Sequence, residues 1–152
     1  MPNHDARRQL DARQQLQDLL DREIAVAHRL AQNLATERHA LTGGSPDAVK
    51  NTVAEKTQLL AGIEALEDQR RMLWDHCTAE GFALGALVAE RWRKLLELIA
   101  GCRTANEVNG HIVHIRQNQV RQLFDIVRGG APVIYGPQGK TFAKALRALA
   151  QA

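Results

Sequence analysis

The sequence predicts an all-α protein: an elongated antiparallel three-helix bundle, or coiled coil, followed by an irregular C-terminal connector. Two patterns indicate this class. Apolar residues recur in alternating steps of three and four through three long stretches, and breaks rich in glycine separate these stretches. In addition, only 4% of the residues are aromatic, so Leu, Ile, Val and Ala must form the core. Three long helices joined by short loops can bury such stripes by packing together. We therefore expect a bundle over residues 1–128 and a separate tail over 129–152.

The first predicted helix covers residues 5–41. Two carboxylates, Glu23 and Glu37, occupy stripe positions where apolar residues are expected. The break at 42–46 (TGGSP) ends this helix and starts the next, because glycine suits a left-handed C-cap and Ser45 before proline is typical of an N-cap. The apolar members of the stripe are Leu16, Leu20, Ala27, Leu30, Leu34 and Leu41.

The second predicted helix covers residues 46–78. Lys56 and Arg70 interrupt its stripe, and glycines at 81 and 85 bracket the next connection. The apolar members of the stripe are Val49, Val53, Leu60, Ile63, Leu66, Leu73 and Cys77.

The third predicted helix covers residues 86–128 and contains Asn109-Gly110, a dipeptide that is a strong hairpin signal elsewhere. Here the steps of four and three run from Val88 to Val127 without a slip, whereas a two-residue turn would reset that phase. We therefore predict one helix through this point, in which Gly110 costs about 1 kcal/mol relative to Ala. Polar residues also fall on this stripe at Asn106, Asn109 and Arg116.

The tail has a different composition from the rest of the chain. Residues 129–139 contain four of the eleven glycines and two of the four prolines, which indicates an irregular connector. Residues 141–151 have the pattern of a short amphipathic helix, with Phe142 and Leu146 on its apolar side. Such a helix is too short to be stable alone in water. Docking on the bundle, docking on a partner and disorder all stay open.

Charge and hydropathy favour a cytoplasmic protein with a basic C-terminal quarter. The net charge is +3, but six basic residues and one acidic residue follow position 110. This excess indicates a surface for an acidic partner. No apolar run reaches the roughly 18 residues of a membrane span, and the polar N-terminus does not resemble a secretory signal. We expect the two cysteines to stay reduced, direct membrane insertion to be absent, and the chain to be a monomer or a weak dimer.

Motifs for catalysis or cofactor binding are weak. The segment Gly136–Thr141 (GPQGKT) has two residues between its glycines where a phosphate-binding loop has four. His111 and His114 are one turn apart but flank the stripe, and Cys77 and Cys102 are most simply core residues. We therefore predict no enzyme activity, no cofactor and no metal. Nucleic-acid binding is also not expected, because the tail has no block of Lys and Arg.

The polar residues on the stripes leave two interpretations open. They either pair across the helices and fix the register of the bundle, or they line an imperfectly closed groove that accepts another helix. The residues concerned are Glu23, Glu37, Lys56, Arg70, Asn106, Asn109 and Arg116, with Gly110 beside them.

Four segments follow one another along the chain: EIAVAHRL at 23–30, AEKTQLLAGIEALEDQRRML at 54–73, LLELIAGCRTANEVNGHIV at 95–113 and IYGPQGK at 134–140. In this order they resemble the FlgN-like flagellar export chaperones, small cytoplasmic helical proteins of the flagellar type III secretion system. The resemblance covers residues 10–140, and its most specific parts are Asn-x-x-Asn-Gly, ending at Gly110, and Tyr-Gly-x-x-Gly, beginning at Tyr135.

The resemblance implies binding rather than catalysis. Such chaperones hold hook–filament junction proteins unpolymerised in the cytoplasm and deliver them to the export gate. By the same resemblance, Tyr135 and Gly136 would engage a partner, either the cytoplasmic domain of the gate or the client. For client contact we select an apolar set that consists of Ile112, Ile115, Val120, Leu123 and Phe124. A structural or adaptor coiled coil without a chaperone cycle is the first alternative, and a nucleic-acid-binding regulator is the second.

Overall fold

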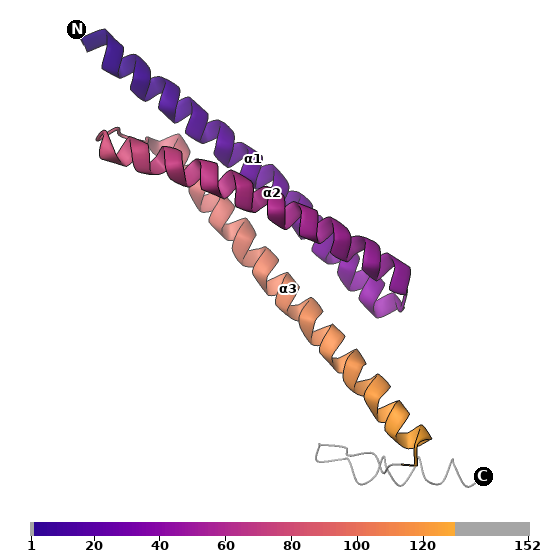
Figure 1. Ribbon diagram of the computed structural model, residues 1–152. Helices are drawn as coiled ribbons and strands as arrows, with labels where there is room; N and C mark the ends of the chain where they lie inside the picture. The colour runs from indigo at the N-terminus through magenta and orange to yellow at the C-terminus, as the bar shows by residue number, and fades with distance from the viewer. Residues whose placement is uncertain (1, 130–152) are drawn as a thin grey trace. The chain divides into compact units, whose positions relative to one another are not determined.

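The computed structural model describes residues 2–129, which form three helices: α1 (Pro2–Gly43), α2 (Pro46–Ala79) and α3 (Ala86–Val127) (Figure 1). No strand occurs among these residues, so the predicted all-α class is confirmed. None of the helices within 2–129 combines the length and the apolar content needed to cross a membrane.

The chain divides into two compact units, residues 1–110 and 111–152. The first unit contains α1, α2 and α3 up to Gly110, and the second begins with the rest of α3. The predicted connector and terminal helix, at 130–152, lie outside the described residues. The predicted division of the chain at residue 129 therefore stays a prediction.

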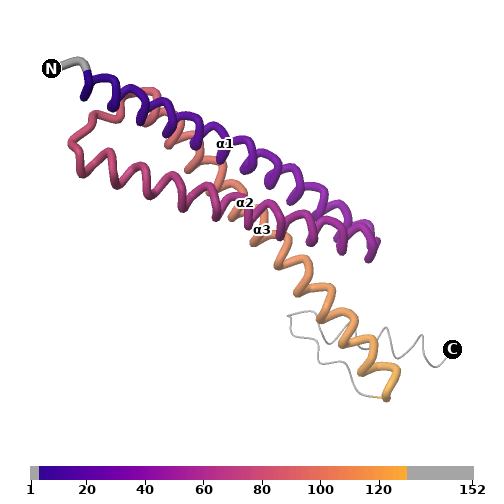
Figure 2. Tube along the Cα trace, turned by 45° about the horizontal axis from the view of Figure 1, so that its top comes forward, coloured from indigo at the N-terminus to yellow at the C-terminus, as the bar shows by residue number. Residues whose placement is uncertain are grey.

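Within the first unit, α1 and α2 lie side by side and antiparallel (Figures 1 and 2). Side-chain pairs fix their register: Glu23 meets Arg70 and Glu37 meets Lys56, so positions advance along α1 as they recede along α2. Contacts from α1 to α3 advance in the same direction on both helices, as in the bonds from Cys102 to Ala27 and from Asn109 to Leu34. This part of α3 is therefore parallel to α1 and antiparallel to α2.

Two apolar clusters form the core of the first unit. The first joins α1 to the start of α3, and Trp74 and Trp92 pack against it with ring centroids 5.7 Å apart. Burying one Leu or Ile side chain contributes roughly 2 kcal/mol, so these clusters supply most of the packing energy. The buried members are Leu16, Leu20, Ile24, Ala27, Val88 and Leu95 in the first cluster, and Leu30, Leu34, Leu59 and Cys102 in the second.

The connections follow the predicted turn chemistry. Gly44 takes a φ of +70°, and the Ser45 hydroxyl accepts a hydrogen bond from the Ala48 amide at 3.4 Å, with proline at the first position of α2. After α2, glycines 81 and 85 also take positive φ values. The Arg13 guanidinium donates to the Ala83 carbonyl and thereby ties this second connection to α1.

The sequence predicted the wrong buried face for the first half of α2. Val53 and Leu60 were expected in the core, yet 42% and 50% of their surfaces are exposed, and Thr52 and Leu59 are buried instead. A buried amide explains the difference, because Asn33 donates to the Thr52 carbonyl at 3.1 Å and turns that face of α2 toward α1. Leu60 is thereby left beside the cavity described below.

The helix α3 continues through Asn109-Gly110, as predicted from the unbroken stripe. Gly110 has an ordinary negative φ, and a Cβ built on it meets no heavy atom within 4 Å. Neither backbone conformation nor close packing in the described part of the chain requires glycine there.

We predict that Gly110→Ala stabilises the protein. The substitution removes the entropic cost of a glycine inside a helix, so the free energy of unfolding should rise by about 0.5–1 kcal/mol in urea denaturation. Gly81→Ala is the matched control, since its φ of +71° disfavours a side chain and stability should fall. A loss of stability in Gly110→Ala would contradict the assignment of open space at this position.

Candidate partner-binding surface

A buried ion pair joins α1 to α2. The Nε atom of Arg70 donates to Oε2 of Glu23 at 2.8 Å, and the two side chains are only 9% and 2% exposed. The Arg70 guanidinium also lies 4.4 Å from the centroid of the Trp92 ring, so an aromatic side chain of α3 covers the same cation. One charged group therefore contacts both of its neighbouring helices.

Burial raises the pKa of the Glu23 carboxyl above its usual range, although the charge and hydrogen bond of Arg70 act in the opposite direction. The nearby Glu67 adds a smaller upward effect. A buried carboxylate loses hydration that one ion pair replaces only in part. Arg70 is therefore what allows Glu23 to occupy the core.

A second polar network lies further along the same helices. Lys56 donates to Glu37 at 2.8 Å and to the Asn106 side-chain oxygen at 3.2 Å, which links all three helices. Glu37 also accepts a hydrogen bond of 2.8 Å from the Asn109 amide. Its carboxylate thus has partners on both α2 and α3.

Asn109 is almost fully buried and uses both ends of its amide. Its nitrogen donates to the Leu34 carbonyl at 2.9 Å, and its oxygen accepts from Nε of Arg38 at 3.1 Å. This position holds α3 against α1 immediately before Gly110. An apolar residue could not make these bonds.

Six of the seven polar stripe residues therefore pair across helices of the first unit. The seventh, Arg116, lies in the second unit and is exposed. Sequence reasoning missed Asn33, which donates to Thr52 and to Glu55 at 3.2 Å and whose oxygen is buried without a partner among the described residues. Because Asn33 lies beside the apolar stripe rather than on it, the periodicity of the sequence did not single it out.

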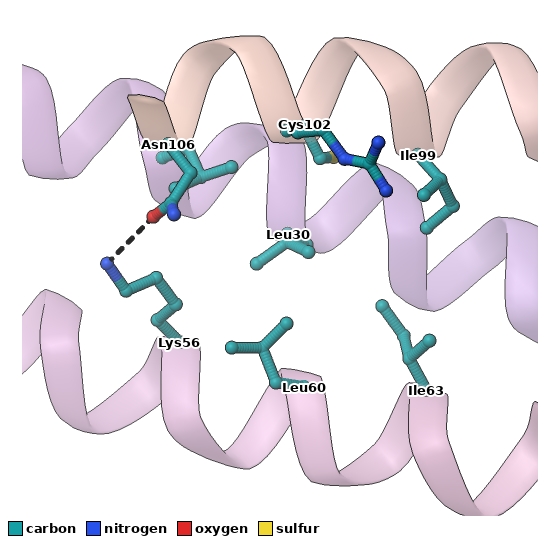
Figure 3. A pocket seen from close by; sticks show the side chains of 9 residues that line it. Leu30, Lys56, Leu60, Ile63, Ile99, Cys102 and Asn106 are labelled. Atoms are coloured by element: carbon teal, nitrogen blue, oxygen red, sulfur yellow. Dashed lines mark hydrogen bonds between the residues drawn. The ribbon is translucent and has the colours of Figure 1, made fainter. Parts of the chain in front are cut away.

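A cavity of about 260 Å³ lies between the three helices next to the Lys56–Asn106 link (Figure 3). In Figure 3, Leu60 and Ile63 project from α2 into this space, where Leu60 lies opposite Leu30 and Ile63 lies opposite Ile99. The walls are predominantly apolar, but two of the polar stripe residues, Lys56 and Asn106, also line the space, as the groove alternative from the sequence had suggested.

A second apolar surface lies on α3 in residues 112–127. Four of the residues selected for client contact are more than half exposed, and the fifth, Ile112, is partly buried. At 100° per residue, the apolar positions here cover about half of the helix circumference. The exposed fractions are 54% for Ile115, 51% for Val120, 61% for Leu123 and 58% for Phe124.

The histidines of this segment lie apart from any cluster of metal ligands. His111 and His114 are exposed, and a ring nitrogen of His114 lies 3.2 Å from the Asn118 amide nitrogen. Within the described residues, no three side chains of His, Cys, Asp or Glu converge. Both cysteines are buried as free thiols, and burial raises the pKa of each. Tyr135 and Gly136, the other predicted partner-binding residues, lie outside the described residues.

The described residues thus define a helical-bundle protein with an exposed apolar helix face. The FlgN protein family matches this sequence over residues 10–142, which is most of its length. The chain belongs to the FlgN family.

Individual relatives agree with this assignment. The flagella synthesis protein FlgN of Salmonella typhimurium LT2 is 27% identical over 129 residues, which span 83% of this chain and 89% of the relative. The flagella synthesis protein FlgN of Yersinia enterocolitica serotype O:8 is 27% identical over 131 residues, which span 83% and 88%. No solved structure matches the chain.

We predict that Arg70→Met destabilises the protein in a pH-dependent way. At neutral pH the free energy of unfolding should fall by about 3 kcal/mol, because a buried carboxylate loses its cation. The substitution removes the influences that lower the pKa of Glu23, so that pKa rises further. In the variant, the folded state binds the proton of Glu23 more tightly than the unfolded state does. The loss of stability relative to the parent chain therefore grows as the pH rises from the usual carboxyl pKa through the raised one.

Urea denaturation at a series of pH values measures this effect. Arg71→Met is the matched control, since it removes an exposed neighbouring arginine and should leave stability nearly unchanged at every pH. A deficit in Arg70→Met that is the same in acid as at neutral pH would argue against coupling to Glu23.

Proposed function

We propose that this protein is a cytoplasmic flagellar export chaperone. It binds the helical termini of hook–filament junction proteins, prevents their premature assembly and delivers them to the export gate. The single observation that carries the proposal is the exposed apolar face of residues 112–127, which occurs in a chain of the FlgN family. The relatives named above are flagella synthesis proteins, which supports a role in flagellum synthesis.

The exposed face has the apolar character and the helical spacing of a helix-binding surface. Val120 and Leu123 lie near its middle, and Ile115 and Phe124 lie toward its two edges by their helical spacing. Burial of apolar surface contributes about 25 cal/mol per Å², and this contribution opposes the entropy that two molecules lose when they associate. A client helix that lays its apolar stripe here would have its own assembly surface covered.

Binding of clients to the 112–127 face would also be temporary. The termini of the clients are disordered before export, so they lose conformational entropy when they bind and fold on the chaperone. That loss limits the net affinity and allows the client to be released at the gate. The chaperone would act as a monomer or a weak dimer, and its function would be binding without catalysis, cofactor or metal.

We predict that Leu123→Asp weakens client binding. Loss of one buried leucine contact removes roughly 1.5–3 kcal/mol, which corresponds to about a ten- to hundredfold higher Kd. Isothermal titration of the full chain with a purified hook–filament junction protein measures this change. His114→Asp introduces the same charge on the opposite, polar side of the helix and should bind like the parent chain.

If Leu123→Asp and His114→Asp bind equally well, the client does not use this face. If the parent chain binds no hook–filament junction protein, the chaperone role is wrong. A structural or adaptor coiled coil then becomes the better description.

We predict a separable role for Tyr135, which belongs to the Tyr-Gly-x-x-Gly motif. Tyr135→Ala should weaken binding to the cytoplasmic domain of the export gate by about tenfold, since tyrosines often supply the dominant contacts of an interface. Client affinity should be retained. Pull-down of each purified partner by the parent chain and by the variant distinguishes the two contacts, and loss of client binding alone would assign Tyr135 to the client instead.

A further inference from the structure

We propose that the cavity in the first unit is a second binding site, which takes an apolar anchor side chain from an acidic amphipathic helix of another protein. The inference concerns residues 1–110 and does not depend on the proposed role of the 112–127 face. It rests on the depth of the cavity, the apolar residues along its mouth and the charge at its edge.

The cavity has a closed apolar floor and an open mouth. Leu30, Leu34 and Cys102 form the floor and are each 5% exposed or less. At the mouth, Leu60 is 50% exposed and points toward the space between the helices (Figure 3). A side chain can therefore enter from solvent and reach buried apolar walls.

The volume suits a large apolar side chain. The cavity measures about 260 Å³. A cavity of roughly 150 Å³ lined by Leu, Ile and Phe already holds a benzene-sized ring. One phenylalanine or leucine therefore fits, and the remaining space admits an adjacent apolar group.

The mouth is bordered by apolar positions at helical spacing, which favours a helix as the element that presents the anchor. On α2, Val53 lies two turns before Leu60 on the same side and is 42% exposed. On α3, Leu96 lies one turn before Ile99 and is 49% exposed. A helix lying along the mouth would cover these residues while its anchor fills the cavity.

The charge at the mouth determines the chemistry of the partner. The lining contains two cations, Lys56 and Arg103, and no carboxylate. Glu37 already neutralises Lys56, but Arg103 takes part in no hydrogen bond or ion pair within the described part of the chain. A carboxylate beside the anchor would pair with Arg103 at the edge of an apolar surface, and a basic segment would be repelled.

Two synthetic helix-forming peptides test the inference against the full chain. Each carries a stripe of leucines at helical spacing, flanked by glutamates in one peptide and by lysines in the other. Fluorescence anisotropy should show that the parent chain binds the glutamate peptide at least about tenfold more tightly. No binding of the glutamate peptide, or equal binding of the two peptides, overturns the inference.

Variants then locate the site. Leu60→Trp fills the cavity from its mouth and should weaken binding of the glutamate peptide by about tenfold or more. Met72→Trp, on the same helix at a position 75% exposed and outside the lining, should not change the affinity. Arg103→Glu should weaken binding of the glutamate peptide and strengthen binding of the lysine peptide.

Peptide binding at the cavity can be distinguished from peptide binding to the 112–127 face. Leu123→Asp should retain the peptide affinity of the parent chain. If Leu123→Asp loses the peptide while Leu60→Trp keeps it, the peptide binds the other face and the cavity is not a binding site. Arg103 is exposed, so its charge reversal tests the site even if Leu60→Trp disturbs the local packing.

Discussion

The register between α1 and α2 depends on two ion pairs, Glu23–Arg70 and Glu37–Lys56. Leucine stripes can slide past one another by a heptad at little cost, because apolar contacts are not directional. A buried carboxylate has no such freedom, since leaving it unpaired would cost several kcal/mol. Both pairs are satisfied in one alignment only, so the polar residues determine which of several similar packings the helices adopt.

The same register determines where the bundle is incomplete. Asn33 turns Thr52 of α2 toward α1, and Leu60 consequently faces a space that no side chain of the described residues fills. The closely packed helices cannot shift to fill this space without breaking the polar bonds on either side of it. The cavity is therefore a consequence of the polar alignment, and the proposed helix-binding site follows from it.

Residues 1–110 and residues 112–127 distribute their apolar surface in opposite ways. In the first of these ranges, two clusters bury apolar side chains, and the polar stripe residues have partners on other helices. Residues 112–127 instead leave most of their apolar positions exposed, without a buried polar pair to specify one internal alignment. A surface of that kind adapts to different apolar stripes, which suits the proposed handling of client helices.

The sequence by itself determined the three helices and the continuation of α3 through Asn109-Gly110, because periodicity and capping residues act locally. It also indicated which polar residues lie on the stripes, together with the apolar set that includes Leu123. Only the tertiary structure decided their partners, such as Arg70 for Glu23, and the rotation of α2 that exposes Leu60. These features depend on contacts between residues far apart in the chain, which a helical period does not specify. The polar stripe residues had suggested an imperfectly closed groove as one alternative, but the place and the apolar walls of the cavity beside Lys56 follow from the same distant contacts.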